Sequence, residues 1–143
     1  MTDAHHAAVA GFLKDFWGAA TELYDDADIF DTLGIDGDDA FEFIERFATK
    51  FEIDIGNYCW YFHHGEEPFI NFGAWLFKPP YRRVYRIPIT PQVLAEAIRA
   101  KRWPLKYPVH NVPSVRWDIR FNQAFALAII ALFVAVLWRR FVR

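Results

Sequence analysis

Residues 34–55 read GIDGDDAFEFIERFATKFEIDI and contain the best-defined helix of the chain. Asp36 is its predicted N-cap, and Asp38 and Asp39 place carboxylates in the first turn, where the helix dipole favours negative charge. The apolar residues recur with the spacing of one helical face; they are Ala40, Phe43, Ile44, Phe47 and Phe51. The stretch therefore predicts an amphipathic helix that ends before Gly56.

Further helical patterns lie on both sides of this stretch. Residues 4–24 place apolar side chains at helical spacing, and Thr90 with Pro91 has the N-cap and N1 residues of a helix that runs through residue 98. Residues 84–90 (VYRIPIT) alternate like a strand, but Pro88 confines such a strand to a sheet edge. The prediction is a mostly α fold with at most a short edge strand.

The stretch 34–55 also resembles the second helix of acyl carrier proteins. That helix begins Gly-x-Asp-Ser-Leu, continues as an acidic amphipathic helix and closes on Phe-x-x-x-Ile; here Asp36, Phe51 and Ile55 match without gaps. The wider pattern resembles a group of small bacterial proteins of acyl-carrier-like fold, over roughly residues 5–103. The resemblance implies a small acyl-carrier-like helical bundle.

One position departs from this family. The serine that carries phosphopantetheine corresponds to Gly37, which has no hydroxyl, so the resemblance implies the fold without the prosthetic arm and without a cofactor. It also implies a surface for a basic protein partner, made of Asp36, Asp38, Asp39, Glu42 and Glu45. A merely solvated helix face has the same composition, and we weigh the two interpretations equally.

The net charge of −2 conceals a strong asymmetry. Residues 1–77 carry 16 acidic and three basic residues, a sum of −13, whereas residues 78–143 carry two acidic and 13 basic residues, a sum of +11. A basic half of this kind indicates contact with a membrane or a nucleic acid, unless the two halves neutralise each other within the fold. The hydrophobic content of 54% excludes intrinsic disorder, and a single cysteine, Cys59, excludes a disulfide framework.

The C-terminal segment explains the basic half best. Residues 124–138 (AFALAIIALFVAVLW) are all apolar, and Trp117 and Trp138 stand 21 positions apart. A helix of that length spans roughly 32 Å, close to the hydrocarbon core of a bilayer. Basic and aromatic side chains flank the span, as the interfaces of a membrane require; they are Arg116, Trp117, Arg120, Trp138, Arg139, Arg140 and Arg143. The alternative is a buried core helix.

These patterns predict four segments. Residues 1–103 form the helical domain, residues 104–120 a proline-rich basic connector, residues 121–138 a single transmembrane helix, and residues 139–143 a basic tail. The N-terminal stretch lacks a basic segment followed by an apolar one, so we expect no secretory signal. More basic residues precede the span than follow it, which favours a tail anchor in the cytoplasmic membrane with the large domain in the cytoplasm.

The sequence therefore predicts a non-enzymatic, membrane-tethered adaptor that contacts anionic lipid headgroups and a basic protein. Its basic, aromatic-rich residues 78–106 also fit single-stranded nucleic acid, but the adjacent span makes lipid the simpler partner. The second hypothesis is an accessory subunit of a larger membrane complex, packed through Ala124, Ala128, Ala131 and Ala135. The third is a metal-dependent enzyme at His63 and His64, with Cys59, Glu66 and Glu67 nearby; adjacent histidines point in different directions, so no metal site is predicted.

Overall fold

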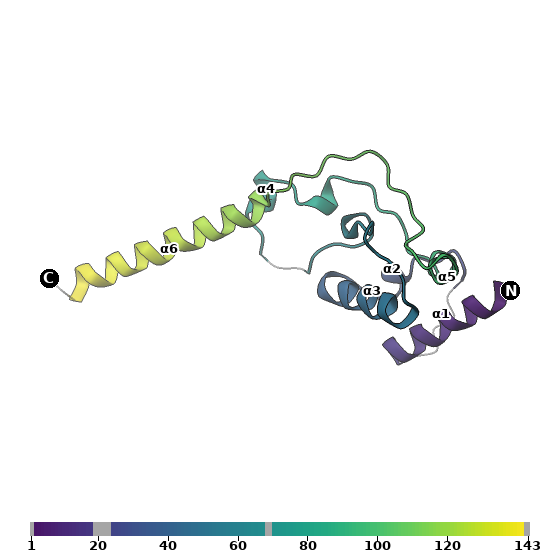
Figure 1. Ribbon diagram of the computed structural model, residues 1–143. Coiled ribbons are helices and arrows are strands. Elements are labelled where there is room, and N and C mark those ends of the chain that lie inside the picture. Colours follow the sequence, from purple (N-terminus) through teal and green to yellow (C-terminus); the bar gives the residue numbers. More distant parts are fainter. Residues whose placement is uncertain (1, 19–23, 68–69, 142–143) are drawn as a thin grey trace. The chain divides into compact units, whose positions relative to one another are not determined.

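The computed structural model describes residues 2–18, 24–67 and 70–141 of the chain, and in these ranges it is mostly helical (Figure 1). The helices are α1 (Thr2–Trp17), α2 (Ile29–Leu33), α3 (Gly37–Phe51), α4 (Gly73–Leu76), α5 (Pro91–Ala100) and α6 (Trp117–Phe141), with the 3₁₀ turns η1 (Trp60–Phe62) and η2 (Pro80–Arg82). The predicted mostly α fold with an apolar C-terminal helix is confirmed. The first helix is shorter than the predicted 4–24: α1 ends at Trp17, and Gly18 and Tyr24 are not helical, while residues 19–23 lie outside the described ranges.

The predicted boundaries of α3 and the predicted start of α5 agree with the structure. Thr90 caps α5 through its Oγ1, which accepts a hydrogen bond from the N–H of Val93 at 3.2 Å. Gly34 ends α2 in the left-handed conformation, with φ of +65°. The short helix α2 begins at Asp28, whose carboxylate accepts from the N–H groups of Phe30 and Asp31.

The predicted edge strand at residues 84–90 is wrong. No strand forms within the ranges that the structure describes. The β-bridge found there is an isolated one, between Asp54 and Arg102. Residues 84–90 use their backbone groups elsewhere: the N–H of Ile87 donates to the carbonyl of Phe62, and the carbonyl of Ile89 accepts from Ile29. With no neighbouring strand and no N–H on Pro88, a ladder cannot form.

The chain divides into two compact units, which we describe separately. Unit 1 consists of Met1–Glu67 and Val84–His110, and unit 2 of Pro68–Arg83 and Asn111–Arg143. This division differs from the predicted segments: unit 2 includes residues 68–83 of the predicted domain 1–103, and α6 begins at Trp117, within the predicted connector 104–120. From the sequence, unit 1 has 17 acidic and eight basic residues, a sum of −9, and unit 2 has one and eight, a sum of +7.

The core of unit 1 is aromatic. Phe12 of α1 packs edge-on against Phe43 and Phe47 of α3, with ring centroids 5.2 and 5.3 Å apart. Helix α5 packs against α1 and buries Leu94 and the residues that follow on the same face. Burial of this many aromatic rings is the main stabilising contribution, because each removes a large apolar area from water.

Candidate functional site

The N-terminus of α3 is covered by a loop of the same chain. Gly37 has φ of +55°, and its N–H donates to the carbonyl of Gly65 at 3.2 Å. A Cβ on Gly37 would lie 2.2 Å from Cγ and 2.9 Å from the backbone N of Glu67. Position 37 therefore admits only glycine in this conformation, for steric and for backbone reasons.

Asp36 helps to hold this loop. It occupies the N-cap position, as predicted, but its side chain makes no cap hydrogen bond; Oδ1 instead accepts from the N–H of Gly65 at 3.0 Å. The expected side-chain cap is therefore wrong. Its carboxylate satisfies a loop N–H 29 residues away, and this bond, with that from Gly37 to Gly65, holds residues 65–67 against the start of the helix.

The carboxylates predicted to bind a partner are on the surface. Asp36, Asp38, Asp39, Glu42 and Glu45 are all exposed. Glu42 forms an ion pair with Arg46 one turn later, so it is partly neutralised by its own helix. The acidic face, which we define as Asp38, Asp39, Glu42 and Glu45, remains predominantly negative.

An aromatic residue in this face was missed from the sequence. Phe41 is 39% exposed, and it lies three residues after Asp38 and four before Glu45, on the same side of the helix. Its ring packs against Trp60 and His64, with centroids 5.8 and 5.0 Å apart. The sequence could have identified Phe41, because it falls outside the apolar stripe of α3. The acidic face therefore lies beside a half-exposed aromatic ring.

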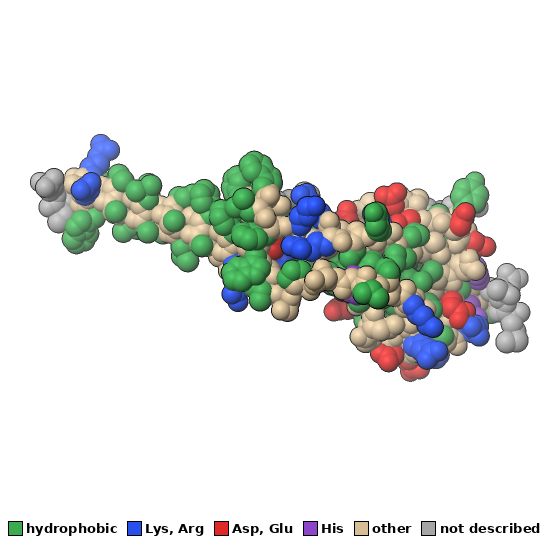
Figure 2. Space-filling view, turned by 90° about the horizontal axis from the view of Figure 1, so that it is seen from above, with side chains coloured by type: hydrophobic (Ala, Val, Ile, Leu, Met, Phe, Trp, Pro, Cys, Tyr) green, Lys and Arg blue, Asp and Glu red, His purple; other side chains and the backbone are tan. Residues whose placement is uncertain are grey.

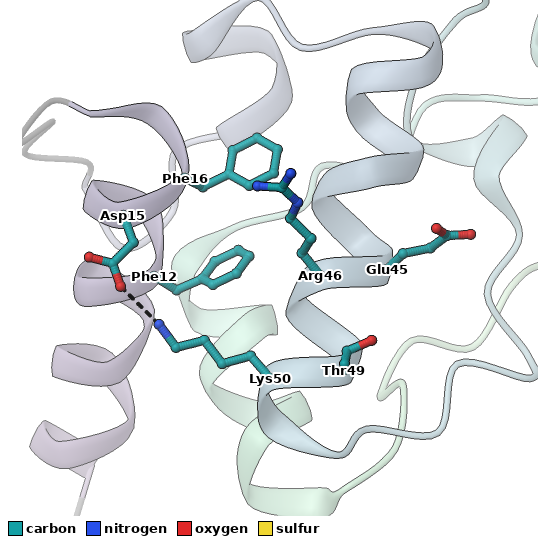
Figure 3. Close-up of a pocket in the computed structure, with 7 residues that line it drawn as sticks. All are labelled: Phe12, Asp15, Phe16, Glu45, Arg46, Thr49 and Lys50. Carbon is teal, nitrogen blue, oxygen red and sulfur yellow. Dashed lines mark hydrogen bonds and ion pairs between the residues drawn. The ribbon is translucent and has the colours of Figure 1, made fainter.

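A surface pocket of about 460 Å³ lies between α1 and α3 (Figure 3). Its lining consists of Phe12, Asp15, Phe16, Glu45, Arg46, Thr49 and Lys50. The two cations are engaged from within: Lys50 Nζ lies 2.9 Å from Asp15 Oδ2, and the guanidinium of Arg46 lies 5.5 Å from the Phe16 ring centroid. The pocket is thus lined by the rings of Phe12 and Phe16 and by cations that already interact with other residues of the chain. Glu45 belongs both to this lining and to the acidic face.

His63 and His64 have separate environments. Because the carbonyl of Ile87 can only accept, Nδ1 of His63 donates to it at 2.8 Å, and Nε2 accepts from the hydroxyl of Tyr107 at 2.7 Å. The Tyr107 oxygen in turn accepts from Nε1 of Trp103 at 2.7 Å and from the N–H of Cys59 at 3.3 Å. Burial lowers the pKa of His63 to about 4, so the ring is neutral at pH 7.

His64 turns the other way. Its Nδ1 donates to the carbonyl of Gly65 at 2.7 Å, and its ring packs among Phe30, Phe41 and Trp60. Burial lowers its pKa as well, and Nε2 has no hydrogen-bond partner among the described residues. Cys59 is half-buried, and its Sγ faces the carbonyl of Asn57. No group of three potential metal ligands occurs among the side chains described.

Unit 2 contains a polar cluster at the start of α6, formed by Asn71, Arg116, Asp118 and Asn122. Arg116 contacts both oxygens of the buried Asp118, at 3.0 and 2.7 Å, and Asn71 Nδ2 donates to Asp118 Oδ2 at 3.1 Å. Asn122 donates to Asn71 Oδ1 at 2.7 Å and accepts from the N–H of Gly73 at 2.8 Å. The cluster fixes α4 against the first turns of α6.

Helix α6 is long and apolar enough to cross a membrane. Its 25 residues extend about 37 Å, its most apolar window has a mean hydropathy of 2.1, and none of that window is buried. Hydrophobic side chains lie along the face of the helix that Figure 2 shows. Within unit 2 the apolar side chains of α6 face outward, which favours a span over the alternative of a buried core helix.

The predicted membrane flanks differ in what they contact. Trp117 and Trp138 are 52% and 67% exposed, and the guanidinium of Arg120 lies 5.4 Å from the Trp117 ring centroid. Arg139 and Arg140 are exposed in the last turn. Arg116 departs from the prediction because it binds Asp118, and Arg143 lies outside the described residues.

Comparisons with known proteins address unit 1 more than α6. Neither the comparison with curated proteins nor that with solved structures finds a match. The family match covers residues 6–106, which include the N-terminus of α3, both histidines and α5, and it stops before α6. The chain belongs to DUF1493, a family of proteins of unknown function.

Proposed function

We propose that this protein is a membrane-tethered, non-enzymatic adaptor of acyl-carrier-like fold that has no phosphopantetheine arm. In this proposal α6 is the single span, and the acidic face of α3 binds a protein with a basic surface. The observation that carries the proposal is the contact at Gly37: Glu67 covers the position that corresponds to the serine of acyl carrier proteins, while the carboxylates beside it are exposed.

The absence of an arm is tested with a phosphopantetheinyl transferase. The protein is incubated with coenzyme A and the enzyme, beside an authentic acyl carrier protein as positive control, and intact masses are measured. We expect no added mass on the wild type. A covalent arm on any residue would contradict the adaptor function.

Electrostatic complementarity supports the acidic face as a partner surface. Among the described residues, Glu42 is the only carboxylate of this face that forms an ion pair. A field of one sign accelerates association with an oppositely charged partner. The half-exposed ring of Phe41 adds an apolar contact of the kind found at interface centres.

Charge-neutralised variants test this surface. Asp38→Asn with Glu45→Gln removes two charges from the acidic face, and Asp26→Asn with Glu52→Gln removes two exposed charges elsewhere in unit 1 as the matched control. Partners captured by crosslinking in membranes of the native host are compared by mass spectrometry. We expect the first pair to lose a basic partner that the control retains; equal capture by both would contradict the assignment of the surface.

The membrane location rests on the exposed apolar surface of α6 and on its flanking charges. More basic residues precede the span than follow it, which supports a cytoplasmic unit 1 at the cytoplasmic membrane. A carbonate wash of membranes tests the span: full-length protein remains in the pellet if α6 is integral, and its release would contradict it. Protease added outside right-side-out vesicles should leave unit 1 intact.

An accessory subunit of a larger membrane complex is the second candidate. The alanines at positions 124, 128, 131 and 135 are exposed on α6, and small side chains let another helix approach closely. A stoichiometric integral partner that copurifies in detergent, and is lost on replacement of Ala128 and Ala131 by Leu, would favour this candidate.

A further inference from the structure

The segment 70–77 of unit 2 exposes an unusual number of large apolar side chains. It reads INFGAWLF, and Ile70, Trp75 and Leu76 are 77%, 83% and 66% exposed. Phe72 and Phe77 are also exposed. Contiguous apolar surface of this kind marks an interaction site, because water otherwise disfavours it.

Hydrogen bonds hold this segment against α6. Asn71 Oδ1 accepts from the N–H of Ala74 at 3.0 Å and from Asn122 at 2.7 Å, so one side chain both starts α4 and ties it to α6. Gly73 permits the close approach: a Cβ there would lie 2.1 Å from the carbonyl oxygen of Asp118. These polar groups of the segment are therefore satisfied within unit 2, and its large apolar side chains remain exposed.

The apolar surface of the segment continues directly into that of α6. The rings of Phe72 and Phe125 have centroids 5.7 Å apart, and those of Phe77 and Phe121 lie 6.3 Å apart. Phe121 stacks on Phe125 along α6. Whatever apolar environment surrounds the first turns of α6 therefore also meets residues 70–77.

The charges next to this surface identify the environment. Unit 2 has eight basic residues, and its single acidic residue, Asp118, is buried and bound to Arg116. Lys78, Arg82 and Arg83 follow the apolar segment directly and are exposed. Tryptophan and phenylalanine side chains beside a cluster of basic residues are typical of the boundary between anionic headgroups and acyl chains.

We propose that residues 70–77 are a second membrane-contacting element, inserted into the headgroup–acyl boundary of an anionic bilayer beside the entry of α6. This proposal rests on the membrane span proposed for α6. Trp75 and Leu76 enter the boundary, Lys78, Arg82 and Arg83 contact lipid phosphates, and the Asn71–Asp118–Asn122 cluster sets the depth at which α6 begins to span.

Site-specific fluorescence in vesicles tests the proposal. The full chain, with Cys59→Ser as background, is reconstituted into phosphatidylcholine–phosphatidylglycerol vesicles and labelled with an environment-sensitive dye at one position at a time. The positions are 75 (Trp75→Cys), 132 (Leu132→Cys, in the span) and 85 (Tyr85→Cys, 94% exposed in unit 1). Each label is quenched by acrylamide from water and by nitroxide lipids with the nitroxide near the headgroup or near the chain end.

The three labels separate the outcomes. We expect acrylamide quenching at position 75 to be several-fold weaker than at position 85, and the headgroup-proximal nitroxide to quench position 75 more than the deep one does. Equal acrylamide quenching at positions 75 and 85, with position 132 still quenched by the deep nitroxide, would overturn this inference and leave the span intact. Acrylamide access at position 132 as well would overturn both.

Discussion

Nε2 of His63 lies 2.7 Å from the hydroxyl oxygen of Tyr107, a residue of the segment that the sequence predicts to be a proline-rich basic connector. Tyr107 satisfies Trp103, Cys59 and His63 through one oxygen atom. Residues 104–110 are consequently part of unit 1, and they help to bury His63, which is neutral at pH 7.

The first prediction concerns acid sensitivity. The pKa of His63 is about 4 in the folded protein, below the ordinary value of 6.5 that applies when the chain is unfolded. The unfolded state therefore binds the proton first, so the free energy of unfolding is undiminished above pH 6.5 and falls as the pH drops toward 4, by about 3 kcal/mol for this residue alone. Urea unfolding in detergent, followed by near-UV circular dichroism between pH 7.5 and 4.5, measures the slope.

The control for this prediction is His63→Gln, which keeps a hydrogen-bonding side chain but does not titrate. Its unfolding free energy should vary less with pH, and the remaining slope belongs in part to His64, whose pKa burial also lowers. A wild-type slope that the substitution leaves unchanged would contradict the assignment.

The second prediction compares two glycines. Gly37 and Gly34 both have positive φ, of 55° and 65°, but a Cβ on Gly34 meets nothing within 4 Å. Gly34→Ser should cost about 1 kcal/mol for the left-handed backbone alone. Gly37→Ser should cost about 2–4 kcal/mol, because the loop at Glu67 must also move. Equal losses in chemical unfolding would show that residues 65–67 do not rest on Gly37.

The third prediction concerns the close approach of α4 and α6. Gly73→Ala places a methyl group 2.1 Å from the carbonyl oxygen of Asp118, so α4 must separate from α6 and the bond from Gly73 to Asn122 is lost. We expect faster chymotryptic cleavage after Phe72, Trp75 or Leu76 in detergent. Gly11→Ala, where nothing lies within 4 Å, is the matched control and should leave the cleavage rate unchanged.

The fourth prediction concerns the buried charge of unit 2. Asp118→Ala leaves the guanidinium of Arg116 and the amide of Asn71 without their main acceptor, and it should destabilise the α4–α6 contact by about 2–3 kcal/mol. Hydrogen exchange of residues 70–77 should accelerate accordingly. Arg120→Gln removes a charge from the same helix. The Arg120 guanidinium lies over the Trp117 ring and outside the cluster around Asp118, so the substitution should leave exchange at wild-type rates.

Periodicity was sufficient to predict the longer helices. The apolar stripe of α3, the Thr90–Pro91 start of α5 and the uninterrupted apolar residues of α6 each specify one element locally, and the structure has all three. Helix α4 has four residues, which is too few for a period to be recognised.

The contacts at the candidate sites depend on residues far apart in the chain, and this is why the sequence did not predict them. Asp36 bonds to Gly65 and Asn71 to Asp118, across 29 and 47 positions. Asp and Asn are also common on solvated surfaces and at helix caps. The local sequence pattern therefore favours water or the adjacent helix N-terminus as their hydrogen-bond partner, and not a residue far along the chain. Pro104 and Pro108 suggest a stiff connector, although Tyr107 between them packs against His63.

The glycine at the start of α3 also limits how this domain can change through evolution. A serine at position 37 is one substitution away, but its side chain would occupy the space of Glu67 and strain the backbone at φ of +55°. A serine there becomes useful for attaching a prosthetic arm only after residues 65–67 have moved. Acquisition of an arm at this position therefore needs at least two coordinated substitutions, with a less stable intermediate between them.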